Sequence, residues 1–167
     1  EIDEITRNLD SPEARSFLIL ERGLFLSSKR ATEARDLLIS FLANFPDNPR
    51  TPEAALALAE SAIFSLPFDR ELALKNITPL KFDLKAKPDF EARRVLVLLA
   101  LNKGIQQAQD FLTKAPSHPL APRVLFQLGQ TYRKPTNERD KEIGKANYQF
   151  ELLIEKYPAS EFTDPAR

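Results

Sequence analysis

The sequence of 167 residues contains no cysteine, no methionine and no tryptophan, and only one histidine. Without cysteine, the chain can form no disulfide, no thiolate nucleophile and no cysteine-ligated metal site. Its 24 basic and 24 acidic side chains cancel to a formal net charge of zero. We therefore expect no nucleic-acid partner, because nucleic-acid binding depends on an excess of basic side chains. No apolar run approaches the roughly 18 residues that cross a bilayer, so we also expect no membrane span.

The first and last residues indicate a piece of a longer protein. The chain opens on Glu1-Ile2-Asp3-Glu4 without an initiating methionine, which is typical of a processed or excised product. We expect any signal peptide or lipid-anchor segment to lie outside it. At the other end, Asp164-Pro165 is typical of the start of a further helix, which predicts that the intact protein continues beyond Arg167.

Glycine is scarce, whereas proline is common. The four glycines are scattered, so the chain has no glycine-rich phosphate-binding loop and we expect no nucleotide cofactor. The 13 prolines recur at the edges of segments rich in alanine, leucine, glutamate, arginine and lysine, which is typical of helix boundaries. Ser11, Thr51 and Asp164 each precede a proline, and we expect these three residues to be helix N-caps.

Apolar residues recur at intervals of three and four between these boundaries. In one segment, Ala34, Leu38, Phe41 and Phe45 share a helix face. The pattern predicts an all-α fold of eight helices near residues 11–27, 31–44, 52–65, 69–78, 89–101, 104–114, 120–133 and 140–156. The segment 79–85 alternates apolar and polar residues like a strand, but it has no partner strand, so we expect an extended loop.

Three predicted helix ends repeat the same spacing. An alanine is followed four residues later by a bulky apolar residue and then by a proline, as in Ala34, Leu38 and Pro46. The same arrangement recurs at Ala146, Phe150 and Pro158, and, one helical turn shorter, at Ala108, Leu112 and Pro116. The spacing predicts helix pairs that repeat every thirty-odd residues, with one insertion.

The fourth predicted pair carries the fullest version of this pattern: Leu125, Leu128, Gly129, Tyr132, Ala146, Phe150 and Pro158. Small residues suit the place where two helices cross closely, and proline ends the second helix. The pattern resembles the tetratricopeptide repeat signature, with Leu125 where the family usually carries tryptophan. The other pairs depart from it, because Glu21, Glu60 and Leu96 stand at the place of Gly129.

The resemblance implies a single domain over residues 1–167, folded as a right-handed superhelical solenoid of about four antiparallel helix pairs. These pairs would cover residues 11–46, 51–79, 89–116 and 120–158, with a further helix starting at residue 164. The aromatic and proline turns at residues 45–49 and 157–162 are similar to those of bacterial periplasmic tetratricopeptide proteins, such as outer-membrane assembly lipoproteins. That likeness favours a periplasmic or outer-membrane-associated protein, although a cytoplasmic one stays compatible with the sequence.

In this family the first helix of each pair lines a concave groove that binds protein. The register implies nine groove residues here: Arg15, Arg22, Phe25, Phe64, Arg93, Arg123, Phe126, Gln130 and Arg133. Guanidinium groups pair with carboxylates and aromatic rings anchor apolar side chains, so we expect a non-enzymatic scaffold or adaptor for a protein or an acidic peptide. Three alternatives stay open: arginines that merely solvate the surface, a helical targeting domain of a larger enzyme, and a self-associating structural array.

Residues that could carry chemistry are isolated. His118 lies in a turn with no second metal ligand and no neighbouring acid in sequence, so we expect an exposed turn residue. Glu138, Asp140 and Glu142 alternate with basic residues, which is typical of a solvated surface. The proline triplets at residues 46–52 and 116–122 have the spacing of a polyproline ligand, but helix-connecting turns explain them better. We expect no catalytic, metal-binding or cofactor-binding residues.

Overall fold

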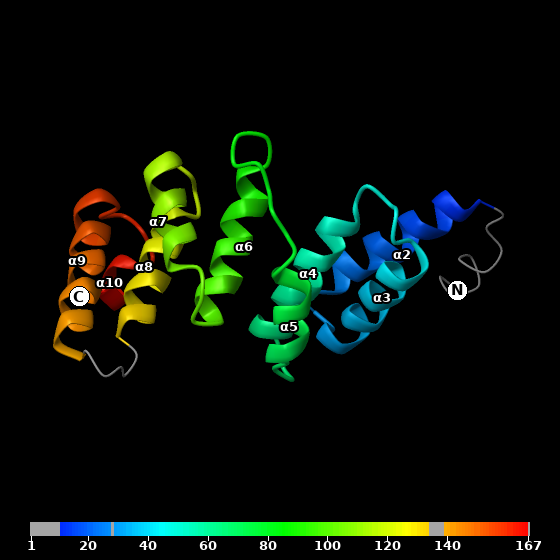
Figure 1. The fold of residues 1–167 in the computed structure, drawn as a ribbon, viewed down its shortest axis with the longest axis horizontal. Coiled ribbons are helices and arrows are strands. Elements are labelled where there is room, and N and C mark those ends of the chain that lie inside the picture. The colour runs from blue at the N-terminus through cyan, green and yellow to red at the C-terminus, as the bar shows by residue number, and fades with distance from the viewer. Residues whose placement is uncertain (1–10, 28, 134–138, 167) are drawn as a thin grey trace. The chain divides into compact units, whose positions relative to one another are not determined.

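The computed structural model describes residues 11–27, 29–133 and 139–166, with the side chains of residues 139–141 left out of the description. Within these residues the fold is all-α, without strands, as the sequence predicts. No helix among them is both long enough and apolar enough to span a membrane. Figure 1 shows helices joined by short turns, with a longer loop between α5 and α6.

The helices match the predicted ones closely. Every boundary of the eight predicted helices lies within one residue of the observed one. The helices are α2 (Pro12–Leu26), α3 (Ala31–Asn44), α4 (Thr51–Phe64), α5 (Arg70–Ile77), α6 (Pro88–Ala100), α7 (Ile105–Lys114), α8 (Ala121–Tyr132), α9 (Arg139–Lys156) and the short α10 (Thr163–Ala166). Residues 79–87 carry no helix or strand, so the expected loop at 79–85 is confirmed.

The helices group into two compact units, Glu1–Leu80 and Lys81–Arg167. In the first unit α2 packs against α3, α3 against α4, and α4 against α5. In the second unit α6 packs against α7 and α8, α7 against α8, α8 against α9, and α9 against α10. Each unit therefore consists of successive helices stacked on their neighbours in sequence, which is the arrangement of helical repeats.

Each unit has its own apolar core. In the first unit the core is built by six buried residues: Leu20, Leu38, Phe41, Ala54, Ala57 and Leu58. In the second unit, Leu99, Phe111, Val124 and Leu128 belong to a larger cluster that continues to α9. One alanine is completely buried in the second helix of every pair: Ala34, Ala73, Ala108 and Ala146. A small buried residue thus recurs in α3, α5, α7 and α9, where it allows a neighbouring helix to pack closely.

Three turns share one backbone structure, at residues 45–51, 115–121 and 157–163. The first shared hydrogen bonds run from Asn48 N to Phe45 O (3.1 Å), from His118 N to Ala115 O (3.1 Å), and from Ser160 N to Tyr157 O (2.9 Å). The second run from Thr51 N to Asn48 O (2.9 Å), from Ala121 N to His118 O (2.8 Å), and from Thr163 N to Ser160 O (3.0 Å). The backbone at Phe45 (φ −132°, ψ 55°) is also nearly that at Ala115 (φ −136°, ψ 54°). The predicted equivalence of these helix ends is confirmed.

A side-chain acceptor completes each turn. Asn48 Oδ1 accepts from the Arg50 N–H at 2.9 Å, and His118 Nδ1 accepts from the Leu120 N–H at 3.1 Å. Ser160 Oγ accepts from the N–H of Phe162 at 3.3 Å. An amide, an imidazole and a hydroxyl therefore satisfy the same backbone donor, which would otherwise need water or another partner.

The predicted N-caps are right at one of three positions. Ser11 caps α2, since its side chain accepts from Ala14 N. Thr51 is wrong as a cap, because α4 begins at Thr51 itself and its hydroxyl donates back to the carbonyls of Phe45 and Pro46 (3.2 Å each). Asp164 is wrong as well, since α10 already begins at Thr163. In both cases the hydrogen-bonded turn, rather than a cap, sets the start of the helix.

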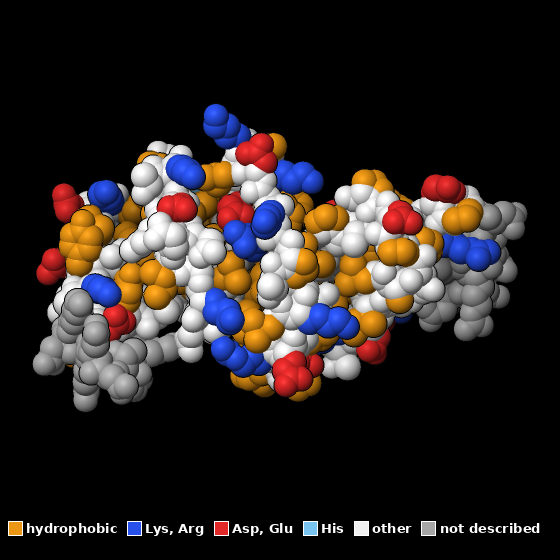
Figure 2. Space-filling view, in the orientation of Figure 1, with side chains coloured by type: hydrophobic (Ala, Val, Ile, Leu, Met, Phe, Trp, Pro, Cys, Tyr) orange, Lys and Arg blue, Asp and Glu red, His pale blue; other side chains and the backbone are white. Residues whose placement is uncertain are grey.

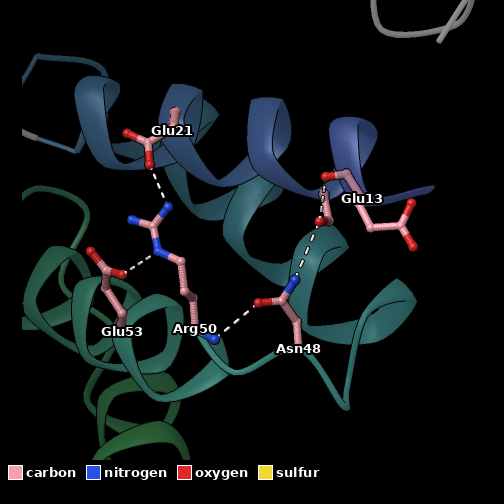
Figure 3. A network of polar contacts seen from close by, with 6 residues as sticks. Glu13, Glu21, Asn48, Arg50 and Glu53 are labelled. Atoms are coloured by element: carbon pink, nitrogen blue, oxygen red, sulfur yellow. Dashed lines mark hydrogen bonds and ion pairs between the residues drawn. The ribbon is translucent and has the colours of Figure 1, made fainter. Parts of the chain in front are cut away.

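A polar network ties the first of these turns back to α2 (Figure 3). Asn48 Nδ2 donates to Ser16 Oγ at 3.2 Å, and Arg50 donates from Nε to Glu53 (2.7 Å) and from Nη1 to Glu21 (2.5 Å). Hydrogen bonds, that with Glu53 first and that with Glu21 second, raise the pKa of Arg50 above its usual value. Arg50 thus stays charged and joins α2, the turn and α4.

The close helix crossings lie at glycine. A Cβ added to Gly129 in α8 would lie 2.5 Å from Cε1 of Phe150 in α9. In the first pair Glu21, which stands at the place of Gly129, is partly exposed, and the close approach lies at Gly23, whose added Cβ would be 3.0 Å from Leu38 Cδ2. The small residue has therefore moved along α2 without loss of the tight crossing.

We expect Gly129→Ala to lower the free energy of unfolding of the second unit by about 1–3 kcal/mol, because the methyl group overlaps a ring held in the core. Gly144 is the matched control: it lies exposed in α9, and an added Cβ meets no atom within 4 Å. Gly144→Ala should raise the same free energy by about 0.5–1 kcal/mol. All three tyrosines lie at or beyond Tyr132, so tyrosine fluorescence during urea denaturation reports on this unit. Equal effects of the two substitutions would contradict the proposed crossing.

Candidate protein-binding surfaces

The groove residues predicted for the first unit lie on the first helices of its two pairs. Arg15, Arg22 and Phe25 are on α2, and Phe64 is the last residue of α4. Phe25 is 64% exposed and Phe64 is 45% exposed. Phe25 lies in the last turn of α2, and Phe64 ends α4. Both helices thus present an exposed aromatic side chain near the C-terminal end.

Charged side chains stand beside these rings. The Lys29 Nζ atom lies 4.4 Å above the centroid of the Phe25 ring, a cation–π contact. Arg22 donates to Glu33 at 2.7 Å, and this hydrogen bond is the main cause that lowers the pKa of Glu33. The Arg22 guanidinium is therefore already engaged by an acid of its own chain, and a guest carboxylate at Arg22 has to compete with Glu33.

A shallow hollow of about 170 Å³ lies beside Phe64. Its lining comes from the end of α2 and the second half of α4: Ser27, Ala57, Glu60, Ser61, Phe64 and Ser65. Two further apolar side chains follow in the α4–α5 turn, where Leu66 is 72% exposed and Phe68 is 67% exposed. The sequence reasoning missed both, although a Leu-Pro-Phe turn between two helices was a signal for exposed apolar residues.

Arg35 of α3 holds this turn in place. Its side chain is 93% buried and donates to Ser61 Oγ at 3.2 Å, to Ser65 O at 2.8 Å and to Pro67 O at 2.6 Å, and also to the Ser61 carbonyl. The guanidinium thus binds carbonyls at the C-terminal end of α4, where the helix dipole favours a cation. The exposed apolar turn is consequently anchored to the core and not a loosely attached loop.

In the second unit the predicted groove residues have mixed surroundings. Phe126 is partly buried, with ring centroids 5.9 Å from Phe150 and 5.6 Å from Phe162, so its ring contributes to the packing of α8 against α9 and the last turn. Arg93 of α6 lies 5.6 Å from the Phe90 ring. The remaining three are Arg123 and Arg133, which are exposed, and Gln130, which is partly buried.

His118 differs from the exposed turn residue that the sequence predicts. Its side chain is only 8% exposed and lies edge-on to Phe111, with centroids 5.3 Å apart. Nδ1 accepts the Leu120 N–H, so in the neutral ring the proton sits on Nε2, which lies 3.0 Å from Asp89 Oδ1. Asp89 is therefore an acid that orients the His118 ring, although it lies 29 positions away in the sequence. The contact between His118 and Asp89 secures the turn onto the start of α6.

The acidic residues singled out in the sequence form no metal site in the described part of the chain. Glu138 and the side chain of Asp140 lie outside the described residues, and Glu142 pairs with Lys145 at 3.1 Å. Among the described residues no group of three or more histidines or acids is placed to hold a metal ion. The first two prolines of each triplet lie in helix-connecting turns, as expected, whereas Pro52 and Pro122 lie in the first turns of α4 and α8.

The face drawn in Figure 2 carries basic and acidic side chains interspersed with apolar ones. No protein-family profile and no curated protein matches the sequence. Evidence about function therefore comes from the arrangement of the side chains themselves.

Proposed function

We propose that this chain is a tetratricopeptide-like, non-enzymatic scaffold whose helix pairs form a right-handed solenoid and bind a partner polypeptide along their first helices. Two structural features support the repeat assignment. The turns at residues 45–51, 115–121 and 157–163 share their hydrogen bonds, and one alanine is buried in each second helix. Equivalent turns and equivalent small residues are what stacking of similar helix pairs requires.

The exposed aromatic side chains of the first unit carry the functional proposal. Phe25 and Phe64 lie near the C-terminal ends of α2 and α4, and both keep about half of their surface or more in water. Burying such rings against a partner gains apolar contact area at little cost in side-chain entropy, which is why aromatic residues dominate binding hot spots. Leu66 and Phe68 enlarge the apolar surface of this unit.

The chemistry around Phe25 favours a partner with acidic residues next to apolar ones. Lys29 is exposed and stacks on the Phe25 ring, and Arg22 already accommodates the carboxylate of Glu33 on the same side of α2 and α3. A partner side chain that packs on Phe25 would bring a neighbouring carboxylate within reach of these cations.

We expect the double variant Phe25→Ala/Phe64→Ala to bind peptides at least tenfold more weakly, since two anchor rings contribute about 1.4 kcal/mol or more together. The probes are peptides selected on the full chain from a displayed random 12-residue library, measured by fluorescence anisotropy. Phe17→Ala is the matched control, because Phe17 is 56% exposed on the same helix but lies about two turns before Phe25. An equal loss for both variants, or a library that yields no binder, would refute the proposal.

A further inference from the structure

A second hollow lies in the second unit, away from the first-helix residues discussed above. It has a volume of about 450 Å³, within the size range of ligand sites. Its apolar floor consists of Leu112 of α7, Leu125 of α8 and Leu152 of α9. Leu125 stands at the position where tetratricopeptide repeats usually carry the larger tryptophan, so a leucine leaves more of this space open.

One polar side chain in this hollow is buried without a partner. Gln149 of α9 is 92% buried, and its side-chain amide has no hydrogen-bond partner among the described residues. Every fully enclosed polar side-chain atom in the described part of the chain has a partner, so the Gln149 amide must remain open to the hollow that it lines. An amide open to the hollow is hydrated in the free protein, and the backbone N–H and C=O groups of a ligand could replace that water.

One cation stands at the far end of the same hollow. Lys156 of α9 lines it and also lines an adjoining hollow of about 590 Å³, and it forms no ion pair with any described residue. Tyr157 lies between the two hollows, and its hydroxyl donates to Pro116 O at 2.5 Å, which fixes the ring. Glu161 lines the adjoining hollow of about 590 Å³ but not the hollow that contains Gln149. An unpaired ammonium group beside an apolar floor complements a carboxylate next to an apolar side chain.

The spacing along α9 defines the ligand further. Leu152 and Lys156 are one helical turn apart, about 6 Å along the axis. In an extended peptide, residues i and i+2 point to the same side and are about 6.7 Å apart. An apolar residue above Leu152 would therefore place the carboxylate of the second residue after it at Lys156. Gln149, which precedes Leu152 by three residues, would then face the peptide backbone just before the apolar residue.

We propose that the hollow between α7 and α9 binds an extended segment of a partner protein with the pattern apolar residue, any residue, Asp or Glu. Leu112, Leu125 and Leu152 receive the apolar side chain, Gln149 bonds the backbone with its amide, and Lys156 pairs with the carboxylate. This site consists of residues of the second unit, whereas Phe25 and Phe64 belong to the first unit, so either site can exist without the other.

The test titrates the isotope-labelled full chain with two capped peptides, acetyl-Ser-Ala-Leu-Ser-Glu-Ser-amide and its Gln counterpart, and follows the spectra by NMR. We expect the Glu peptide to shift the Gln149 side-chain amide and the methyl groups of Leu125 and Leu152. The Glu peptide should bind about three- to fivefold more tightly than the Gln peptide, the value of one exposed ion pair. In Lys156→Gln the two peptides should bind equally, whereas Lys103→Gln, an exposed lysine that lines neither hollow, should keep the preference.

Gln149→Leu gives a second, independent readout. It should weaken both peptides by about tenfold, because the backbone loses its amide partner. It should leave the stability of the free protein unchanged or higher, since the amide has no partner to lose. The inference is overturned if the Gln149 and leucine signals do not move, or if the preference for Glu persists in Lys156→Gln. The Phe25→Ala/Phe64→Ala variant leaves the residues of this hollow unchanged. A negative result for the hollow is therefore distinguishable from a negative result for the Phe25 and Phe64 surface.

Discussion

The backbone hydrogen bonds of one turn, found at three places, set how α4, α8 and α10 follow the helices before them. In each turn, a backbone N–H donates to the side chain of the residue two positions earlier. The acceptors are the side chains of Asn48, His118 and Ser160. With two further backbone bonds, the turn leaves the chain only one direction in which the next helix can begin. Because this geometry recurs after α3, α7 and α9, the helices α4, α8 and α10 start in the same way, whereas a longer loop at residues 79–87 leads into α6.

The turn is constant in backbone but variable in chemistry. Its acceptor residue also reaches back to the first helix of the pair, as Asn48 does to Ser16 and His118 to Asp89. Two positions later, Arg50 forms an ion pair with Glu21 of α2, whereas Phe162 stacks on the Phe126 ring of α8. Side chains of quite different character thus hold these turns against the preceding helices, so the likeness of the turns lies in their backbone and not in residue identity.

Local signals made the helices predictable, whereas contacts between distant residues were not. Proline positions and apolar periodicity located every helix boundary within one residue. By contrast, the hydrogen bond between Arg35 and Ser61 joins residues 26 positions apart, and that between His118 and Asp89 joins residues 29 positions apart. Neither contact follows from a local spacing pattern. The unpartnered Gln149 was equally hidden, because its burial depends on how α9 lies against α7 and α8. The predicted Phe25 and Phe64 are exposed, but Phe126 is engaged in packing.

Amide hydrogen exchange measured by NMR tests the recurring turn most directly. The account predicts that the backbone amides of Arg50, Leu120 and Phe162 exchange slowly, since each is bonded to a side-chain acceptor, whereas those of Asp47, Ser117 and Ala159 in the same turns exchange quickly. Fast exchange of Arg50, Leu120 and Phe162, at the rate of their unbonded neighbours, would contradict it.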